Sequence, residues 1–89
     1  MKTHINLTVF GKVQGVGFRY QVKGIADSLN IFGYIRNMND GSVYIEAEGN
    51  TEILREFLAI IKSSPGISRI DNIDVEEGAL DNYRDFTVY

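Results

Sequence analysis

The sequence predicts an α+β protein in which two helices cover one face of a single antiparallel sheet. Residues 5–13 alternate between apolar and polar side chains, which is the period of a strand with one buried face. From Phe18 the apolar residues recur at helical spacing. Strand-like alternation and helical spacing both occur again in the second half of the chain. A chain of 89 residues has room for one hydrophobic core. We therefore expect residues 1–89 to form a single domain.

The first half of the chain is predicted to contain a strand, a helix and a second strand. The strand of residues 5–13 breaks at two glycines, and a helix begins at Phe18. Asn30 is a typical left-handed residue at a helix end. Residues 32–38 alternate again, with Ile35 facing inward, and indicate the second strand.

The second half repeats this pattern after a tight turn at residues 39–42, which joins two strands. Asn50 is predicted to cap a second helix, which ends at residues 63–66. Strands at residues 69–77 and 86–89 follow. The order βαββαβ with a short extra C-terminal strand is that of a ferredoxin-like two-layer sandwich. Because this fold serves many functions, it does not by itself predict one.

Composition excludes several classes of function. The chain has no cysteine, so it has no disulfide, thiolate nucleophile or cysteine-based metal site. A net charge of −3 argues against broad binding to nucleic acids or anionic membranes. The sequence has neither a signal-peptide pattern nor an apolar run long enough to cross a bilayer. We expect a soluble cytoplasmic monomer.

The connection between the first strand and the first helix has the features of a phosphate-binding loop. A helix N-terminus leaves main-chain N–H groups unpaired, with the positive end of the helix dipole behind them. Glycines at positions 15 and 17 allow the main chain to curl around an anion, and an arginine in the first turn adds a fixed cation. The predicted loop consists of Gly15, Val16, Gly17, Phe18 and Arg19.

Topology is expected to bring Asn37 to the same place. In this fold the first two strands run parallel with the third between them, so the loop and the end of the second strand share one edge of the sheet. About 9–10 Å, two strand spacings, separate their main chains. Asn37 lies two residues after inward-facing Ile35, which puts it on the helix-bearing face. Arg19 and Asn37 are therefore predicted to lie together.

Other chemistry is not indicated. The sequence has no P-loop motif, and His4 is predicted to be a solvated edge residue rather than a catalytic base. The acidic residues of the fourth predicted strand are expected to lie on its solvent-exposed side rather than to bind a metal. They are Asp71, Asp74, Glu76 and Glu77. We expect no metal and no cofactor. Without a nucleophile–base pair, the loop can offer only charge stabilisation and positioning, which suit a substrate with a good leaving group, such as an acyl phosphate.

Two motifs carry a family resemblance. Residues 11–19, Gly-Lys-Val-Gln-Gly-Val-Gly-Phe-Arg, closely resemble the signature of acylphosphatases, and residues 33–37 with 40–43 resemble that family's second motif. The resemblance covers essentially the whole chain. It implies hydrolysis of the carboxyl–phosphate bond of acyl phosphates to a carboxylate and inorganic phosphate, without a cofactor or a covalent intermediate. It also implies that Arg19 and the loop N–H groups hold the phosphate, and that Asn37 orients the attacking water.

Two alternatives remain at this stage. Phe10, Tyr34 and Tyr44 point to the open sheet face, where ferredoxin-like RNA-binding domains stack bases. We favour cross-strand packing as the explanation of these aromatic residues, because the acidic net charge and Glu46 and Glu48 on the same face oppose a polyanion. The second alternative is a non-catalytic anion-binding module, similar to the acylphosphatase-like domain of larger hydrogenase-maturation proteins.

Overall fold

The computed structural model describes residues 1–63 and 66–89, and it contains every predicted element. In chain order these are β1 (Lys2–Lys12), α1 (Phe18–Ser28), β2 (Phe32–Asn37), β3 (Val43–Asn50), α2 (Thr51–Lys62), β4 (Arg69–Gly78) and β5 (Phe86–Val88). The first strand begins three residues earlier than residue 5, because His4 continues the pairing with β3.

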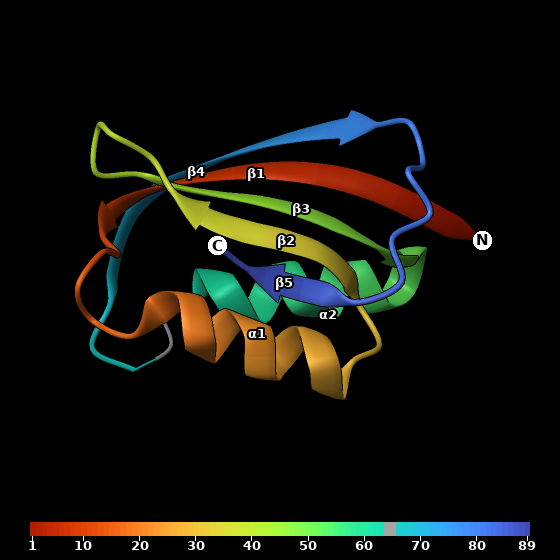
Figure 1. Ribbon diagram of the computed structural model, residues 1–89, viewed down its shortest axis with the longest axis horizontal. Coiled ribbons are helices and arrows are strands. Elements are labelled where there is room, and N and C mark those ends of the chain that lie inside the picture. Colours follow the sequence, from red (N-terminus) through yellow and green to blue (C-terminus); the bar gives the residue numbers. More distant parts are fainter. Residues whose placement is uncertain (64–65) are drawn as a thin grey trace.

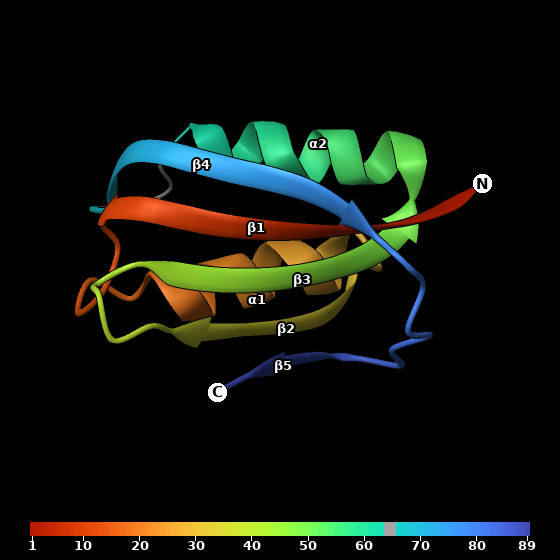
Figure 2. The ribbon, with the colours of Figure 1, turned by 90° about the horizontal axis from the view of Figure 1, so that it is seen from above.

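The sheet has the order β4-β1-β3-β2-β5, and both helices lie against the same face (Figures 1 and 2). β1 and β2 pair antiparallel with β3 on its two sides, so they run parallel to each other. This confirms the predicted ferredoxin-like topology. β5 differs from the rest of the sheet, since it joins β2 in parallel.

The core lies between the two layers and follows the predicted periodicity. Side chains of alternate strand residues meet one stripe of each helix, and all of these side chains are buried. The main contributors are Leu7, Val9, Ile35, Val43, Ile45 and Ala47 from the sheet, and Phe18, Val22, Ala26, Leu54, Phe57 and Ile61 from the helices. Within residues 1–63 and 66–89, no helix is long and apolar enough to span a membrane.

The predicted helix boundaries are largely correct. Asn30 has a φ of 55°, the left-handed conformation expected after α1. The Asn50 side chain accepts a hydrogen bond of 3.0 Å from the Glu52 main-chain N–H and thus caps α2. α2 ends at Lys62, but the predicted stop at residues 63–66 includes Ser64 and Pro65, which lie outside the described residues.

The prediction that His4 is solvated is wrong, since its side chain is only 2% exposed. His4 lies on the open sheet face, directly opposite Glu48 of β3. The connection between β4 and β5 covers this part of the face, and the ring of Tyr83 stacks on the imidazole with 6.0 Å between centroids. A polar connection with no regular period thus buries a residue that strand periodicity alone places at the surface.

Candidate active site

The loop between β1 and α1 is built from two left-handed glycines. Gly15 has a φ of 73° and Gly17 a φ of 77°. A Cβ atom at either position would meet nothing within 4 Å, so the backbone conformation, rather than lack of space, favours glycine here. Among the described residues, the main-chain N–H groups of residues 15–20 have no hydrogen-bond partner. Together with the N-terminus of α1 they provide unpaired donors, which suit an anion.

Two apolar side chains anchor this loop to the core. Phe18 is only 1% exposed and lies in the hydrophobic core, and Val16 is half-buried against it. Their side chains are therefore directed away from any ligand in the loop. These two predicted site residues can contribute only their main-chain N–H groups.

Arg19, in the first turn of α1, is half-buried and is held by the end of the chain. Its Nη1 donates a hydrogen bond to the main-chain oxygen of Tyr89. The Tyr89 N–H in turn donates to the carbonyl of Ile35 over 2.9 Å. Among residues 1–63 and 66–89, no Asp or Glu side chain pairs with Arg19, so no acidic side chain competes with an anion for its guanidinium.

Asn37 is the last residue of β2 and is exposed. It lies directly opposite Val43, which in turn lies opposite Val9. Both valines are completely buried against the helices, and directly opposed residues of a sheet point to the same face. Asn37 is therefore on the helix-bearing face, and its side-chain amide has no hydrogen-bond partner in the described part of the chain.

Two bridges attach the loop to the residues that flank Asn37. Gln14 Nε2 donates to the carbonyl oxygens of Met38 (2.8 Å) and Ser42 (2.9 Å). The second bridge runs from the Arg19 guanidinium through Tyr89 to β2. Figures 1 and 2 show the loop and the β2–β3 turn at the same end of the sheet. Sequence analysis located the loop and Asn37 but missed the Gln14 bridge, because it considered Gln14 only as one residue of the motif 11–19.

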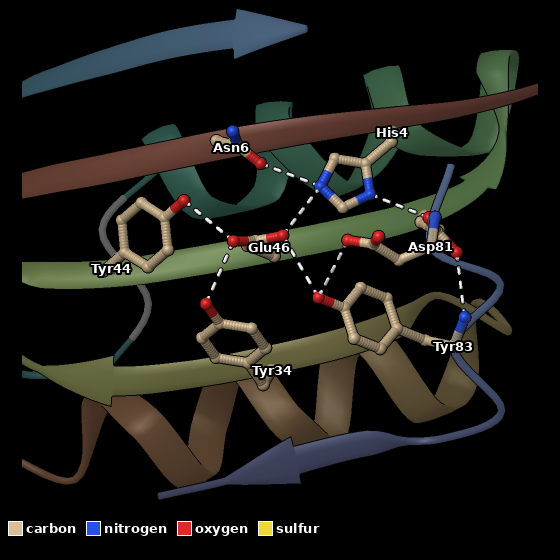
Figure 3. Close-up of polar contacts among 8 residues, drawn as sticks. His4, Asn6, Tyr34, Tyr44, Glu46, Asp81 and Tyr83 are labelled. Carbon is tan, nitrogen blue, oxygen red and sulfur yellow. Dashed lines mark hydrogen bonds and ion pairs between the residues drawn. The ribbon is translucent and has the colours of Figure 1, made fainter. Parts of the chain in front are cut away.

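A hydrogen-bond network on the open face holds the segment between β4 and β5 against the sheet (Figure 3). His4 Nδ1 lies 2.8 Å from Glu48 Oε2, and His4 Nε2 lies 2.9 Å from Glu46 Oε1. Glu48 also accepts hydrogen bonds from the main-chain N–H groups of Asp81 and Tyr83. Because this segment leads directly into β5, the network also fixes the strand that ends beside the loop.

The network favours the charged forms of His4 and Glu48. Burial alone lowers the pKa of His4, but hydrogen bonds to Glu48 and Asn6 and the charge of Glu46 raise it above its ordinary value. Burial alone raises the pKa of Glu48, but the Asp81 N–H and the His4 hydrogen bond bring it below its ordinary value. Both imidazole nitrogens face acceptor oxygens, which suits a protonated ring.

The tyrosines of the open face are bound to the same network. Hydroxyl groups of Tyr34, Tyr44 and Tyr83 donate to Glu46 over 3.0, 2.9 and 3.2 Å. Burial, followed by the Glu46 hydrogen bond, raises the pKa of Tyr44 to about 12. These hydroxyls therefore surround a carboxylate, an arrangement that favours a structural role for the rings.

One cluster with metal-ligand chemistry was missed by sequence analysis. Ligand atoms of His4, Glu48 and Asp81 lie within 4.8 Å of one another. His4 and Glu48 are hydrogen-bonded directly to each other, and both nitrogens of the His4 ring already have oxygen partners. We therefore interpret this cluster as part of the network that fixes the C-terminal segment.

Comparison with known proteins shows which family the chain belongs to. The family model for acylphosphatases matches residues 5–88. The chain belongs to the acylphosphatase family. An acylphosphatase of Ligilactobacillus salivarius is 48% identical over 83 residues, 92% of each chain. The crystal structure of the acylphosphatase from Bacillus subtilis superposes with a TM-score of 0.93 at 37% identity, covering 100% of this chain and 99% of that one.

The family fold also occurs inside a larger protein. The crystal structure of full-length HypF in its phosphate- and nucleotide-bound form matches with a TM-score of 0.90 at 35% identity. The match covers 100% of this chain but only 12% of HypF. The fold of this chain thus also forms one part of a much longer protein.

Proposed function

We propose that this chain is an acylphosphatase, which hydrolyses the carboxyl–phosphate bond of an acyl phosphate to a carboxylate and inorganic phosphate. One observation carries the proposal: unpaired N–H groups of residues 15–20 and the Arg19 cation lie at the same sheet edge as the Asn37 amide. This arrangement offers charge stabilisation and positioning, the two means by which phosphoryl transfer is mainly accelerated.

In the proposed mechanism, the loop N–H groups and the guanidinium of Arg19 bind the phosphoryl oxygens. The Asn37 carboxamide orients a water molecule for in-line attack on phosphorus. The water oxygen forms the new P–O bond while the bond from phosphorus to the carboxyl oxygen breaks. The carboxylate leaves with the bonding electron pair, and the proton of the water passes to phosphate or solvent. No covalent enzyme intermediate forms, and no metal or cofactor is required.

The partners follow from this chemistry. The substrate is a small acyl phosphate, recognised through its phosphoryl group, and inorganic phosphate binds as a product. We also propose that residues 1–89 act as a single domain, as a monomer in the cytoplasm and without nucleic acid. The open face supports the last point, because a polyanion there would meet the carboxylate of Glu46 within its ring of tyrosine hydroxyls.

We predict that the purified protein hydrolyses benzoyl phosphate at an unchanged rate in excess EDTA. The proposed site consists only of N–H donors, a guanidinium and an amide, none of which needs a metal ion to bind phosphate. The measurement is the steady-state rate before and after chelation, with added Mg²⁺ as a control. Complete loss of activity on chelation would contradict the metal-free mechanism.

We predict that Asn37→Ala loses turnover while substrate binding is largely retained. The amide is assigned to the water rather than to the phosphate, so kcat should fall by about 10² or more with little change in KM. Asn39→Ala, in the exposed turn after β2, is the matched control and should retain kcat. If Asn37→Ala turned over at nearly the wild-type rate, its role with water would be wrong.

A further inference from the structure

Gln14 connects the two halves of the candidate site, although neither half includes it. Its side chain leaves the start of the loop and reaches the hairpin turn that follows Asn37. Both hydrogens of its amide are used there, on the carbonyls of Met38 and Ser42 at 2.8 and 2.9 Å. Gln14 thus binds the turn through two donors fixed in one plane.

The turn that receives these bonds is itself well fixed. The Met38 N–H donates to the Ser42 carbonyl over 2.8 Å, and the Gly41 N–H donates to the Met38 carbonyl over 3.2 Å. Asp40 Oδ1 accepts from both the N–H (2.9 Å) and the hydroxyl (2.5 Å) of Ser42. These two bonds also lower the pKa of Asp40. A bond to this turn therefore holds the end of β2, and with it Asn37, rather than a loose segment.

We propose that Gln14 is a positioning residue, which sets the distance between the phosphate-binding loop and Asn37. This inference rests on the proposed function of those two parts. The loop binds phosphate with groups that are local to residues 15–20, whereas attack on phosphorus needs water held at Asn37. A misplacement on the order of 1 Å can reduce a rate by about 10²-fold without abolishing binding. Gln14 is the described side chain that joins the loop directly to the residue after Asn37.

The test begins with Gln14→Met, which keeps the length of the side chain but removes both donors. We expect kcat to fall about ten- to hundredfold, while KM and the inhibition constant of inorganic phosphate change by less than about threefold. Gln21→Met makes the same chemical change on α1 and should leave kcat unchanged. An unchanged kcat in Gln14→Met, with only a lower melting temperature, would reduce Gln14 to a structural role and overturn the proposal.

A double-mutant cycle with Asn37→Ala then separates positioning from general stabilisation. If Gln14 acts by placing the loop relative to Asn37, Gln14→Met should cost less than about twofold in kcat once the Asn37 amide is absent. The same cost in both backgrounds would overturn the proposal but leave the function of the site intact. A wild-type kcat in Asn37→Ala alone would instead overturn the proposed role of Asn37, and the positioning role with it.

Should Gln14→Met fail to fold, Gln14→Asn provides the same comparison. It retains an amide but shortens the side chain by one methylene, so it cannot reach both carbonyls without moving the loop. We expect an intermediate loss of kcat that also disappears in the Asn37→Ala background. A loss that persists in that background would contradict the positioning role.

Discussion

Replacing Arg19 by glutamine is expected to remove both phosphate binding and most turnover. Its guanidinium is the charged side chain of the loop. In the proposed mechanism it binds the phosphoryl oxygens, which are negatively charged in the substrate and whose charge is redistributed in the transition state. Loss of one preorganised donor typically costs about 10²–10³ in rate, and we expect loss of the Arg19 cation to cost more. Steady-state kinetics, with inorganic phosphate as a competitive inhibitor, should show a raised KM, a raised inhibition constant and a reduced kcat.

Two further variants sharpen this prediction. Arg19→Lys keeps the charge but loses the planar guanidinium with its two parallel donors. Compared with Arg19→Gln, it should restore phosphate binding in part and kcat to a smaller extent. Arg55→Gln removes an arginine from the exposed surface of α2, where it pairs with Glu52 at 3.4 Å, and should change neither constant. Activity of Arg19→Gln within a few-fold of wild type would show that the loop N–H groups alone stabilise the transferring phosphoryl group.

The fold could be predicted because its signals are local. Alternation in residues 5–13 and the helical stripe from Phe18 each specify an element without knowledge of the rest of the chain. Element order then limits the topology to one in which the loop and the end of β2 share an edge. The location of Asn37 follows from these rules, since it depends only on strand parity and crossover direction.

The contacts of individual side chains could not be predicted, because they depend on register between distant segments. His4 and Glu48 face each other only once β1 and β3 are aligned, and aligning their alternating patterns could have suggested that pair. Nothing in residues 79–85 indicates that this connection folds back over the sheet. The Gln14 bridge is hidden for the same reason, since its partners are main-chain carbonyls, which leave no trace in the sequence.

The burial of Glu48 explains why so polar a network stabilises the fold. Its side chain is fully buried, and its carboxylate accepts hydrogen bonds from His4 and from two main-chain N–H groups. Removing one partner from a buried ion pair leaves the other partner uncompensated, which typically costs about 3–5 kcal/mol. Loss of the acceptor would also release the segment around Asp81 and Tyr83, which leads into β5.

We therefore predict that Glu48→Gln lowers the free energy of unfolding by about 3 kcal/mol. Denaturant unfolding followed by circular dichroism gives this value, and Glu56→Gln, an exposed change on α2, is the matched control. kcat measured at a temperature where the variant is folded should fall less than in Arg19→Gln, since the hydrogen-bond partners of Glu48 are His4, Asp81 and Tyr83 and do not include the loop. An unfolding free energy equal to that of Glu56→Gln would show that the buried carboxylate is dispensable.

The pH dependence of stability distinguishes loss of the ion pair from loss of packing. Because the folded pKa of His4 is raised, its contribution is fully present below about pH 6.5 and is lost as pH rises through the folded pKa. The pKa of Glu48 is lowered, so its contribution is present above about pH 4.5 and is lost as pH falls through the folded pKa. The pair should therefore stabilise the wild type most between these values. In Glu48→Gln, the free energy of unfolding should fall less steeply with rising pH above about pH 6.5 than it does in the wild type. A pure packing defect would instead lower the free energy of unfolding equally at every pH.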